Sequence, residues 1–299
     1  MYKLIYNGID ILPKSNNLSW ENDIDTLGIM LSFDSLYNVP VGAIISLYIN
    51  NKEYTRGIIV DKTESVFAYS YLSHDYSFYL KNEVIKQFNT SASNAIVSLL
   101  NEFGIKNKIV SIPTRINKIY KDESIADIIE DILEQAEKDQ GIKYIKEMQI
   151  DTVVIEKLED MKITPKILIG KDITINSSIE DMRNKILITS GSGDNIGIIT
   201  TAQNKASQMQ YGILQEVEVL DDKDIAQSKS IAENLLIAKN RIFKEAIIPL
   251  LGVKDAETIK ANRLIELNVD TKLKGWYRIK SASHELTNSK HTVNIELEW

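Results

Sequence analysis

Apolar and polar residues alternate in short runs along the first part of the chain, and turn residues separate the runs. The stretch YKLIYNGIDI carries Asn7-Gly8, a pair typical of a two-residue β-hairpin turn when apolar alternation flanks it. The same plan recurs where apolar residues alternate from Ile45 to Ile49 before the turn residues Asn50-Asn51. The Tyr-rich run SVFAYSYLSHDYSFYL suits a half-buried pleated surface. The pattern predicts a small β-barrel or sandwich over residues 1–88.

The apolar period changes to three or four residues between positions 89 and 162, which indicates helices. A first helix is predicted to start at Ser91 or Ser93 and to stop at Gly104, with apolar positions at Ile96, Leu99, Leu100 and Phe103. A second helix is predicted to start at Ser124 and to stop at Gly141. Ser124 lies three residues before Asp127, which is a capping-box spacing. The stretch GIKYIKEMQIDTVVIEKL then predicts a strand pair that turns near Gln149 to Asp151. We expect a small α+β insertion over residues 89–162.

Strands return over residues 163–299, and one helix interrupts them. This helix is predicted from about Asp224 to Phe243, with one apolar face formed by Ile231, Leu235, Ala238 and Ile242. No low-complexity tract or Pro/Gly/Ser linker separates the three regions. The predicted fold class is α+β, mainly β, with a β unit at each end and the α+β insertion between them.

The terminal stretch GWYRIKSASHELTNSKHTVNIELEW reads as a hairpin of two alternating strands. Apolar side chains face each other when Ile279 is opposite Leu297. The same register pairs opposite charges, since Arg278 then faces Glu298 and Lys280 faces Glu296. The hairpin is predicted to close a β-barrel.

Two of the three histidines lie in this hairpin and are the first candidates for a catalytic site. Continued without interruption, the register places His284 on the polar face opposite Thr292, and His291 at the mouth of the loop near Glu285. Catalytic groups must lie within hydrogen-bond distance of the same reacting atoms. The two rings are therefore predicted not to converge, and a structural role is favoured over a catalytic one.

Composition narrows the classes of function. The 299 residues are 43% hydrophobic and 26% charged, as in an ordinary globular protein, with a formal net charge of −7. A general nucleic-acid binder would carry a basic face, so specific nucleic-acid binding is not expected. The absence of cysteine excludes disulfides, a thiol nucleophile and cysteine metal sites. No export signal and no apolar run of membrane-spanning length are visible, so no membrane insertion is expected.

Three further sequence patterns are candidates for a binding or catalytic site. The Gly-rich stretch SGSGDNIG, from Ser190 to Gly197, lacks the Lys-Ser/Thr of a phosphate-binding P-loop and precedes a strand, which favours a hairpin loop. The acidic side of the second helix consists of Glu123, Asp127, Glu130, Asp131, Glu134 and Glu137 and has no EF-hand spacing, which favours a solvated or partner-facing charge run. Ser73, His74 and Asp75 are neighbours in a strand and cannot form a triad among themselves. No catalytic, cofactor-binding or metal-binding residue is predicted.

Five stretches carry a resemblance to a known family. They are VPVGAIISLYINNKEYTRGIIVDKTES, YSYLSHDYSFYLKNE, SASNAIVSLL, QMQYGILQEVEVLDDKDIAQSKSIAENLL and the terminal hairpin. Their order and character resemble the baseplate hub proteins of contractile phage tails and phage-tail-like bacteriocins, including the T-even hub. The hub part of type VI secretion spike proteins is related to this family.

The resemblance implies a structural protein and not an enzyme. It implies a homotrimer in which each chain supplies two tail-tube-like barrels, so that a pseudo-hexameric ring joins the hexameric tail tube to the trimeric central spike. Further expected partners are other baseplate proteins and the tape measure. Assembly in the bacterial cytoplasm and a final place in the baseplate of a virion or bacteriocin follow from the same resemblance. Two alternatives stay open, a tail-tip cell-wall hydrolase and a carbohydrate- or receptor-binding β module.

Overall fold

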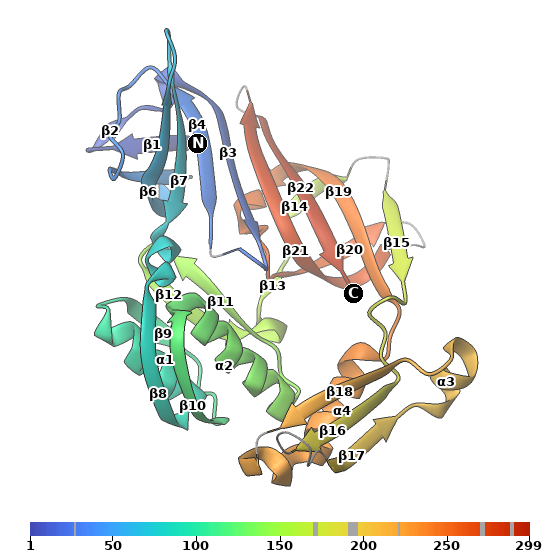
Figure 1. Cartoon of the computed structure of the whole chain (residues 1–299). Coiled ribbons are helices and arrows are strands. Elements are labelled where there is room, and N and C mark those ends of the chain that lie inside the picture. Colours follow the sequence, from blue (N-terminus) through green and yellow to red (C-terminus); the bar gives the residue numbers. More distant parts are fainter. Residues whose placement is uncertain (27, 170–172, 191–196, 221, 270–272, 288–289) are drawn as a thin grey trace.

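The computed structural model describes residues 1–26, 28–169, 173–190, 197–220, 222–269, 273–287 and 290–299. Within these ranges a 14-stranded sheet runs through the molecule, and three smaller sheets and four α-helices accompany it (Figure 1). Most residues lie in strands, which confirms the α+β, mainly β class. The main path of the large sheet follows the order β14-β19-β22-β21-β3-β4-β7-β6-β5-β1-β2.

The N-terminal strands form one curled half of the large sheet. They are β1 (Tyr2–Tyr6), β2 (Ile9–Asp10), β3 (Ser15–Asp23), β4 (Met30–Ser35), β5 (Ile44–Ile49), β6 (Lys52–Glu64) and β7 (Tyr69–Asp75). Both predicted tight turns are confirmed. Asn7 and Gly8 have φ angles of 47° and 77°, and Asn50 and Asn51 have 52° and 62°, as a hairpin turn with two left-handed residues requires. The inward side chains, among them Phe33 and Leu47, form a buried core.

A helical layer follows the 3-10 turn at Tyr76–Lys81. Its elements are β8 (Glu83–Ser91), α1 (Ala92–Glu102), β9 (Lys106–Ile109), β10 (Arg115–Ser124), α2 (Ile125–Gln140), β11 (Tyr144–Gln149) and β12 (Thr152–Lys157). Ser91 caps α1 and Ser124 caps α2 through their side-chain oxygens, and Gly141 ends α2 with φ 66°, as predicted. The expected strand pair is also present, since β11 and β12 are antiparallel. Phe103 departs from the predicted apolar stripe, because it lies beyond the last turn of α1 and is 39% exposed.

The C-terminal strands form the other half of the large sheet. They are β13 (Lys162–Ile163), β14 (Lys166–Ile169), β15 (Thr174–Ser178), β19 (Phe243–Lys254), β20 (Leu264–Val269), β21 (Leu273–Thr287) and β22 (Lys290–Glu298). Their inward side chains, among them Ile248, Ile279, Ile295 and Leu297, form a second buried core.

A separate three-stranded sheet with two helices is inserted between β15 and β19. Its elements are β16 (Lys185–Ser190), β17 (Gly197–Gln203), α3 (Lys205–Tyr211), β18 (Gln215–Leu220), the 3-10 turn Asp222–Gln227 and α4 (Ser228–Lys239). The helix predicted from Asp224 to Phe243 is thus shorter. Phe243 already begins β19, because tertiary pairing with β15 and β22 overrides the helical pattern. Ala238 and Ile242, predicted for the apolar face of the helix, are exposed.

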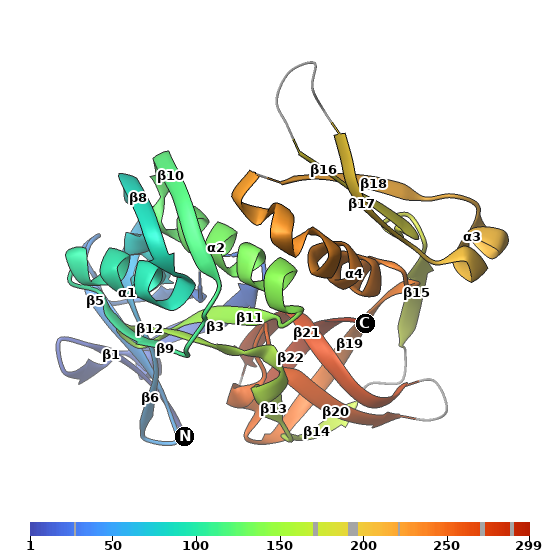
Figure 2. The same ribbon diagram turned by 90° about the horizontal axis from the view of Figure 1, so that it is seen from below.

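The two helical parts meet through α2 and α4, which lie side by side (Figure 2). The Asn234 side chain donates to the carbonyl of Lys138 over 3.0 Å, and Lys138 forms an ion pair of 2.6 Å with Glu218. Among the described residues, no helix is both long and apolar enough to cross a lipid bilayer.

The terminal hairpin follows the predicted register only up to a bulge. Ile279 is opposite Leu297 and Arg278 is opposite Glu298, as predicted. Lys280 is then skipped, so that Ser281 is the residue opposite Glu296. The Lys280 side chain still reaches Glu296 over 3.0 Å, so the expected ion pair exists without direct strand pairing. An extra residue of this kind inverts the facing of every side chain that follows it.

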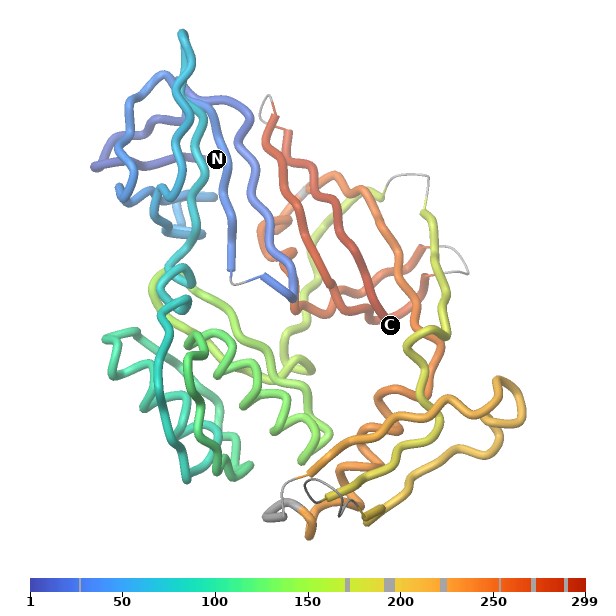
Figure 3. Tube along the Cα trace, in the orientation of Figure 1, coloured from blue at the N-terminus to red at the C-terminus, as the bar shows by residue number. Residues whose placement is uncertain are grey.

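The edge of β21 that faces away from β22 pairs with β3 and so joins the two halves of the large sheet. Beyond the bulge, Ser281 to Leu286 pair with Asp23 to Leu18 on β3 in antiparallel fashion. Figure 3 shows the contact as the place where the blue start and the red end of the chain run side by side. We call this pairing the β3–β21 joint.

Candidate functional site

The two histidines of the terminal hairpin meet inside the β3–β21 joint. His284 Nδ1 lies 2.8 Å from His291 Nε2, and both side chains are buried. The Trp20 ring from β3 stacks on His284 with centroids 4.9 Å apart, and the Tyr2 hydroxyl from β1 lies 2.9 Å from His291 Nδ1. The prediction that the rings do not converge is therefore wrong. We call this group of four side chains the histidine seam.

The bulge at Lys280 explains the error. Without it, His284 would face the polar side opposite Thr292; with it, His284 is opposite Val293 and points into the interior, beside Trp20 on the other neighbouring strand. The signal is present in the chain. The inward apolar positions change from odd to even numbers between Ile279 and Ala282, while the partner strand keeps its phase.

The hydrogen bonds of the seam have one consistent direction. His284 Nε2 lies 2.9 Å from the carbonyl oxygen of Ile259, which can only accept, so His284 donates there and accepts at Nδ1. His291 must then donate from Nε2 and accept at Nδ1, where the Tyr2 hydroxyl donates. Every polar atom of the two rings is paired when both are neutral.

Burial holds both imidazoles in the neutral form. It lowers the pKa of His284 to about 3, with His291 and Lys260 adding repulsion, and lowers the pKa of His291 to about 4. His284 is only 1% exposed and His291 only 6%, so neither ring can reach a bound substrate. The geometry makes the seam a structural polar network.

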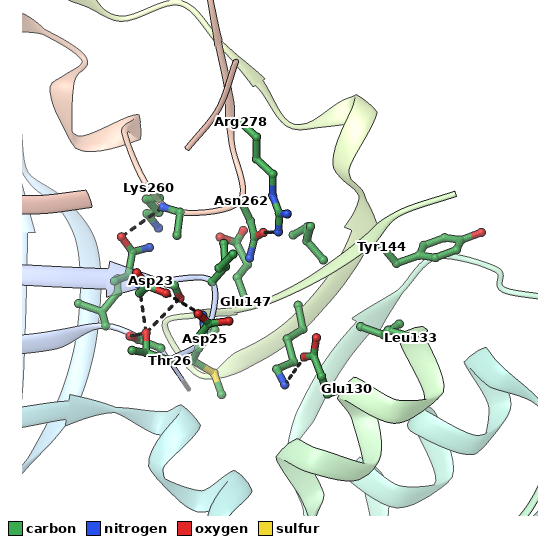
Figure 4. Close-up of a pocket in the computed structure, with 18 of the residues that line it drawn as sticks. Asp23, Asp25, Thr26, Glu130, Leu133, Tyr144, Glu147, Lys260, Asn262 and Arg278 are labelled. Atoms are coloured by element: carbon green, nitrogen blue, oxygen red, sulfur yellow. Dashed lines mark hydrogen bonds and ion pairs between the residues drawn. The ribbon is translucent and has the colours of Figure 1, made fainter. Parts of the chain in front are cut away.

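A polar pocket of about 260 Å³ lies where the N-terminal strands, the helical layer and the C-terminal strands meet (Figure 4). The end of β3 supplies Asp23, and the turn that follows it supplies Asp25 and Thr26. The other sides come from α2 with β11 and from the segment 260–262 before β20.

Several charged side chains around this pocket are held by polar partners. Glu147 forms an ion pair of 2.6 Å with Arg263, and Glu130 one of 2.8 Å with Lys146. Arg278 binds Glu298 and the side chain of Asn262. Burial raises the pKa of the Glu147 carboxyl, but Arg263 and Lys260 outweigh it and hold the pKa below its ordinary value. A general acid for glycoside cleavage needs a raised pKa, so Glu147 does not suit that task.

The Ser-His-Asp stretch of β7 has a local structural use. Asp75 Oδ2 accepts from the backbone N–H of Ile29 over 2.8 Å, and Oδ1 accepts from the N–H and the hydroxyl of Ser77. Burial raises the pKa of Asp75 to about 6, although these hydrogen bonds act against the rise. The carboxylate therefore fixes the β3–β4 connection and caps the 3-10 turn after β7.

The acidic side of α2 is partly paired with bases of neighbouring strands. Asp131 binds Lys118 over 2.9 Å and accepts from the Tyr120 hydroxyl over 2.6 Å, while Glu137 reaches Lys143 over 3.4 Å. Among the described residues, no group of three or more His, Asp or Glu side chains could hold a metal ion.

The Gly-rich stretch lies largely outside the described residues, at 191–196. The residues on either side of it, Ser190 and Gly197, are opposite each other in the antiparallel strands β16 and β17. Its place between two strands of one hairpin is thus as predicted.

The first prediction from the seam concerns pH. Unfolded histidines take up protons below about pH 6.5, whereas the folded pair resists protonation down to about pH 4. The unfolded state then binds more protons, so stability is complete above about pH 6.5 and decreases as the pH falls. Urea unfolding should show a loss of roughly 2–4 kcal/mol between pH 7.5 and 5. The control H74N, outside the seam, should keep most of this loss. A flat profile contradicts the buried neutral pair.

A second prediction concerns the end of the network. Tyr2→Phe keeps the ring but removes the hydroxyl that donates to His291. The buried Nδ1 atom loses its partner, which should lower the free energy of unfolding by about 1–3 kcal/mol. Tyr6→Phe, on the same strand, is the matched control and should change it by less than about 0.5 kcal/mol. Equal values for the two variants would show that the seam does not contribute as described.

Comparisons with known proteins agree with this architecture. The 43 kDa tail protein of prophage MuSo2 from Shewanella oneidensis superposes with a TM-score of 0.71 at 13% identity, covering 99% of this chain and 97% of that one. A tail protein from Neisseria meningitidis gives 0.69 at 11% identity over 100% and 96%. A type VI secretion component from E. coli, described as similar to T4 tail proteins, gives 0.58 at 10% identity over 99% and 76%.

These similarities confirm the resemblance to phage-tail hub proteins at the level of the fold. No curated protein matches the chain in sequence. One family model does match, over residues 18–298, which is nearly the whole chain. The chain therefore belongs to the YQBQ-like family.

Proposed function

We propose that the protein is the structural hub of a contractile-tail baseplate. Three copies form a pseudo-hexameric ring that joins the hexameric tail tube to the trimeric central spike. Its fold is that of phage-tail proteins, which supports a structural role in the tail. Other baseplate proteins are further partners, assembly takes place in the bacterial cytoplasm, and the protein has no catalytic activity of its own.

One observation carries the proposal: the two halves of the large sheet repeat the same strand arrangement, and β5 and β6 lie 220 positions before their equivalents β20 and β21. In both halves a six-residue strand is followed by a long strand, which pairs with a third strand through one bulge, as β5-β6-β7 and β20-β21-β22. The bulged residues are Val60 and Lys280, and the residues before them, Ile59 and Ile279, are likewise 220 positions apart.

The repeat extends across four strands. In the first half, Ile59, Ser73, Leu31 and Trp20 form a row of paired residues on β6, β7, β4 and β3. In the second half, the corresponding row is Ile279, Leu297, Ala246 and Ile175 on β21, β22, β19 and β15. Two equivalent β units in each chain support the division into two tail-tube-like barrels, 1–88 and 163–299, around the insertion 89–162.

A chain with two equivalent units suits the symmetry of such an assembly. Three copies present six similar units to a hexameric tube, while the assembly keeps three-fold symmetry for a trimeric spike. Repeated head-to-tail contacts form a ring when the rotation closes. A cell-wall hydrolase is not favoured, because Glu147 in the polar pocket forms an ion pair with Arg263 and its pKa is held below the ordinary value.

The expected result is a mass of three chains by light scattering, for the protein alone or after mixing with the spike protein of its own locus. The chain mass is 33.9 kDa, so trimer and monomer are well separated. A chain that stays monomeric and also fails to bind the spike protein contradicts the proposed hub.

A further inference from the structure

Among the described strands, one edge of β6 lacks the strand partner that the equivalent edge of β21 has. In the second half, Ser281 to Leu286 of β21 pair with β22 on one side and with β3 on the other. The equivalent segment, 220 positions earlier, is Asp61 to Glu64 of β6 with Ser65 and Val66 of the turn that follows it. Up to Glu64 it pairs with β7 on one side, and on the other side no described strand pairs with it.

The second half carries the matching free strand. β3 pairs with β4 in the same way as β15 pairs with β19. Trp20 is opposite Leu31 in the first pair of strands, and Ile175 is opposite Ala246 in the second. β3 uses its other edge for the joint with β21. No described strand pairs with the other edge of β15.

We infer that, in the assembled ring, β15 of one protomer adds as an antiparallel strand to the free edge of β6 of the next, with Ile175 opposite Glu64. This register copies the β3–β21 joint, in which Trp20 is opposite His284. The inference rests on the proposed function, because it takes a ring of copies of this chain as given and assigns the surfaces that form it. Strand addition of this kind gives affinity through backbone hydrogen bonds.

Apolar side chains at the end of the edge support the register. In the β3–β21 joint Leu286 is opposite Leu18, and both are buried or partly buried in the N-terminal core. The equivalent residues are Val66, in the turn after β6, and Ile173, directly before β15. Val66 is 88% exposed in the single chain, and pairing with Ile173 of a neighbour would cover it.

The two edges are also placed for a head-to-tail contact. Figure 1 shows β6 among the N-terminal strands and β15 on the far side of the C-terminal strands. Neither chain has to open to make the pairing, and each protomer keeps one free edge of each kind until the ring closes.

The β3–β21 joint and the inferred contact between copies are expected to differ in strength. The β3–β21 joint carries the aromatic and histidine side chains of the seam, while the predicted contact has Ile175 and Glu64 at the equivalent positions. Lys62 and Glu64 form an ion pair along the β6 edge. A charged edge is a common protection of single chains against random pairing. The contact between copies is therefore expected to be reversible, and the joint within the chain permanent.

Disulfide trapping tests the register directly. The bond from Ile24 N–H to the Lys280 carbonyl makes Asp23 and Ser281 a non-hydrogen-bonded pair, and alternation gives Glu21 and Ser283 the same type. Their equivalents are Asn176 and Thr63, both exposed in the single chain. Such pairs have Cα atoms about 4.5 Å apart, within disulfide range. The chain has no cysteine of its own, so T63C/N176C should give cross-linked dimers and trimers under mild oxidation.

Matched variants define the controls. T63C and N176C alone should give no cross-link at this contact. T63C/S177C places the second thiol on the opposite face of β15 and should cross-link far less. Glu64→Pro in the cross-linking background removes a backbone N–H that points to the free edge and should lower the yield roughly tenfold, whereas Glu64→Ala, which keeps the N–H, should not.

The outcomes separate this inference from the proposed function. In one outcome the protein forms a trimer by light scattering, while T63C/N176C cross-links no better than T63C/S177C. This result overturns the strand pairing and leaves the proposed hub function standing. A chain that stays monomeric, with or without the spike protein, overturns both. Cross-linking in register that Glu64→Pro suppresses supports the pairing.

Discussion

The antiparallel pairing of β3 with β21 is the constraint on which the rest of the structure depends. It connects strands from opposite ends of the chain and makes one sheet from two repeated halves. The bulge at Lys280 turns the following residues toward the interior and so places His284 beside Trp20. The histidine seam then fills the interior of the joint, and every ring nitrogen of its two histidines is paired. The same joint provides the pattern for the contact that we infer between copies.

Local signals in the sequence were sufficient for most individual elements. The turns at Asn7-Gly8 and Asn50-Asn51, the caps Ser91 and Ser124, and the end of α2 at Gly141 each follow from the conformational preference of one or two residues. The limits of α4 did not follow, because pairing of β19 with two distant strands decides where the helix ends. Elements set by local chemistry were predictable, while elements set by tertiary pairing were not.

The candidate site shows the same division at the scale of single side chains. The ion pair of Arg278 and Glu298 was predictable from strand register alone. The meeting of His284 with His291 was not predicted, because one bulged residue inverts the facing of everything beyond it. The contacts of Tyr2 and Ile259 depend on segments far away in the chain, and no local pattern announces them. The change of phase between Ile279 and Ala282 was the one available signal.

Native-state hydrogen exchange of the β3–β21 joint tests the central claim most directly. Alternation places Trp20 and His284 in a hydrogen-bonded pair, so both amides are protected by the joint itself. If the two halves form one cooperative sheet, these amides should exchange only through global unfolding, with the same opening free energy as those of Ser73 and Ile295 in the central strands β7 and β22. Exchange of Trp20 and His284 through a lower-energy opening, while Ser73 and Ile295 stay protected, would show that the halves are independent and would contradict the account.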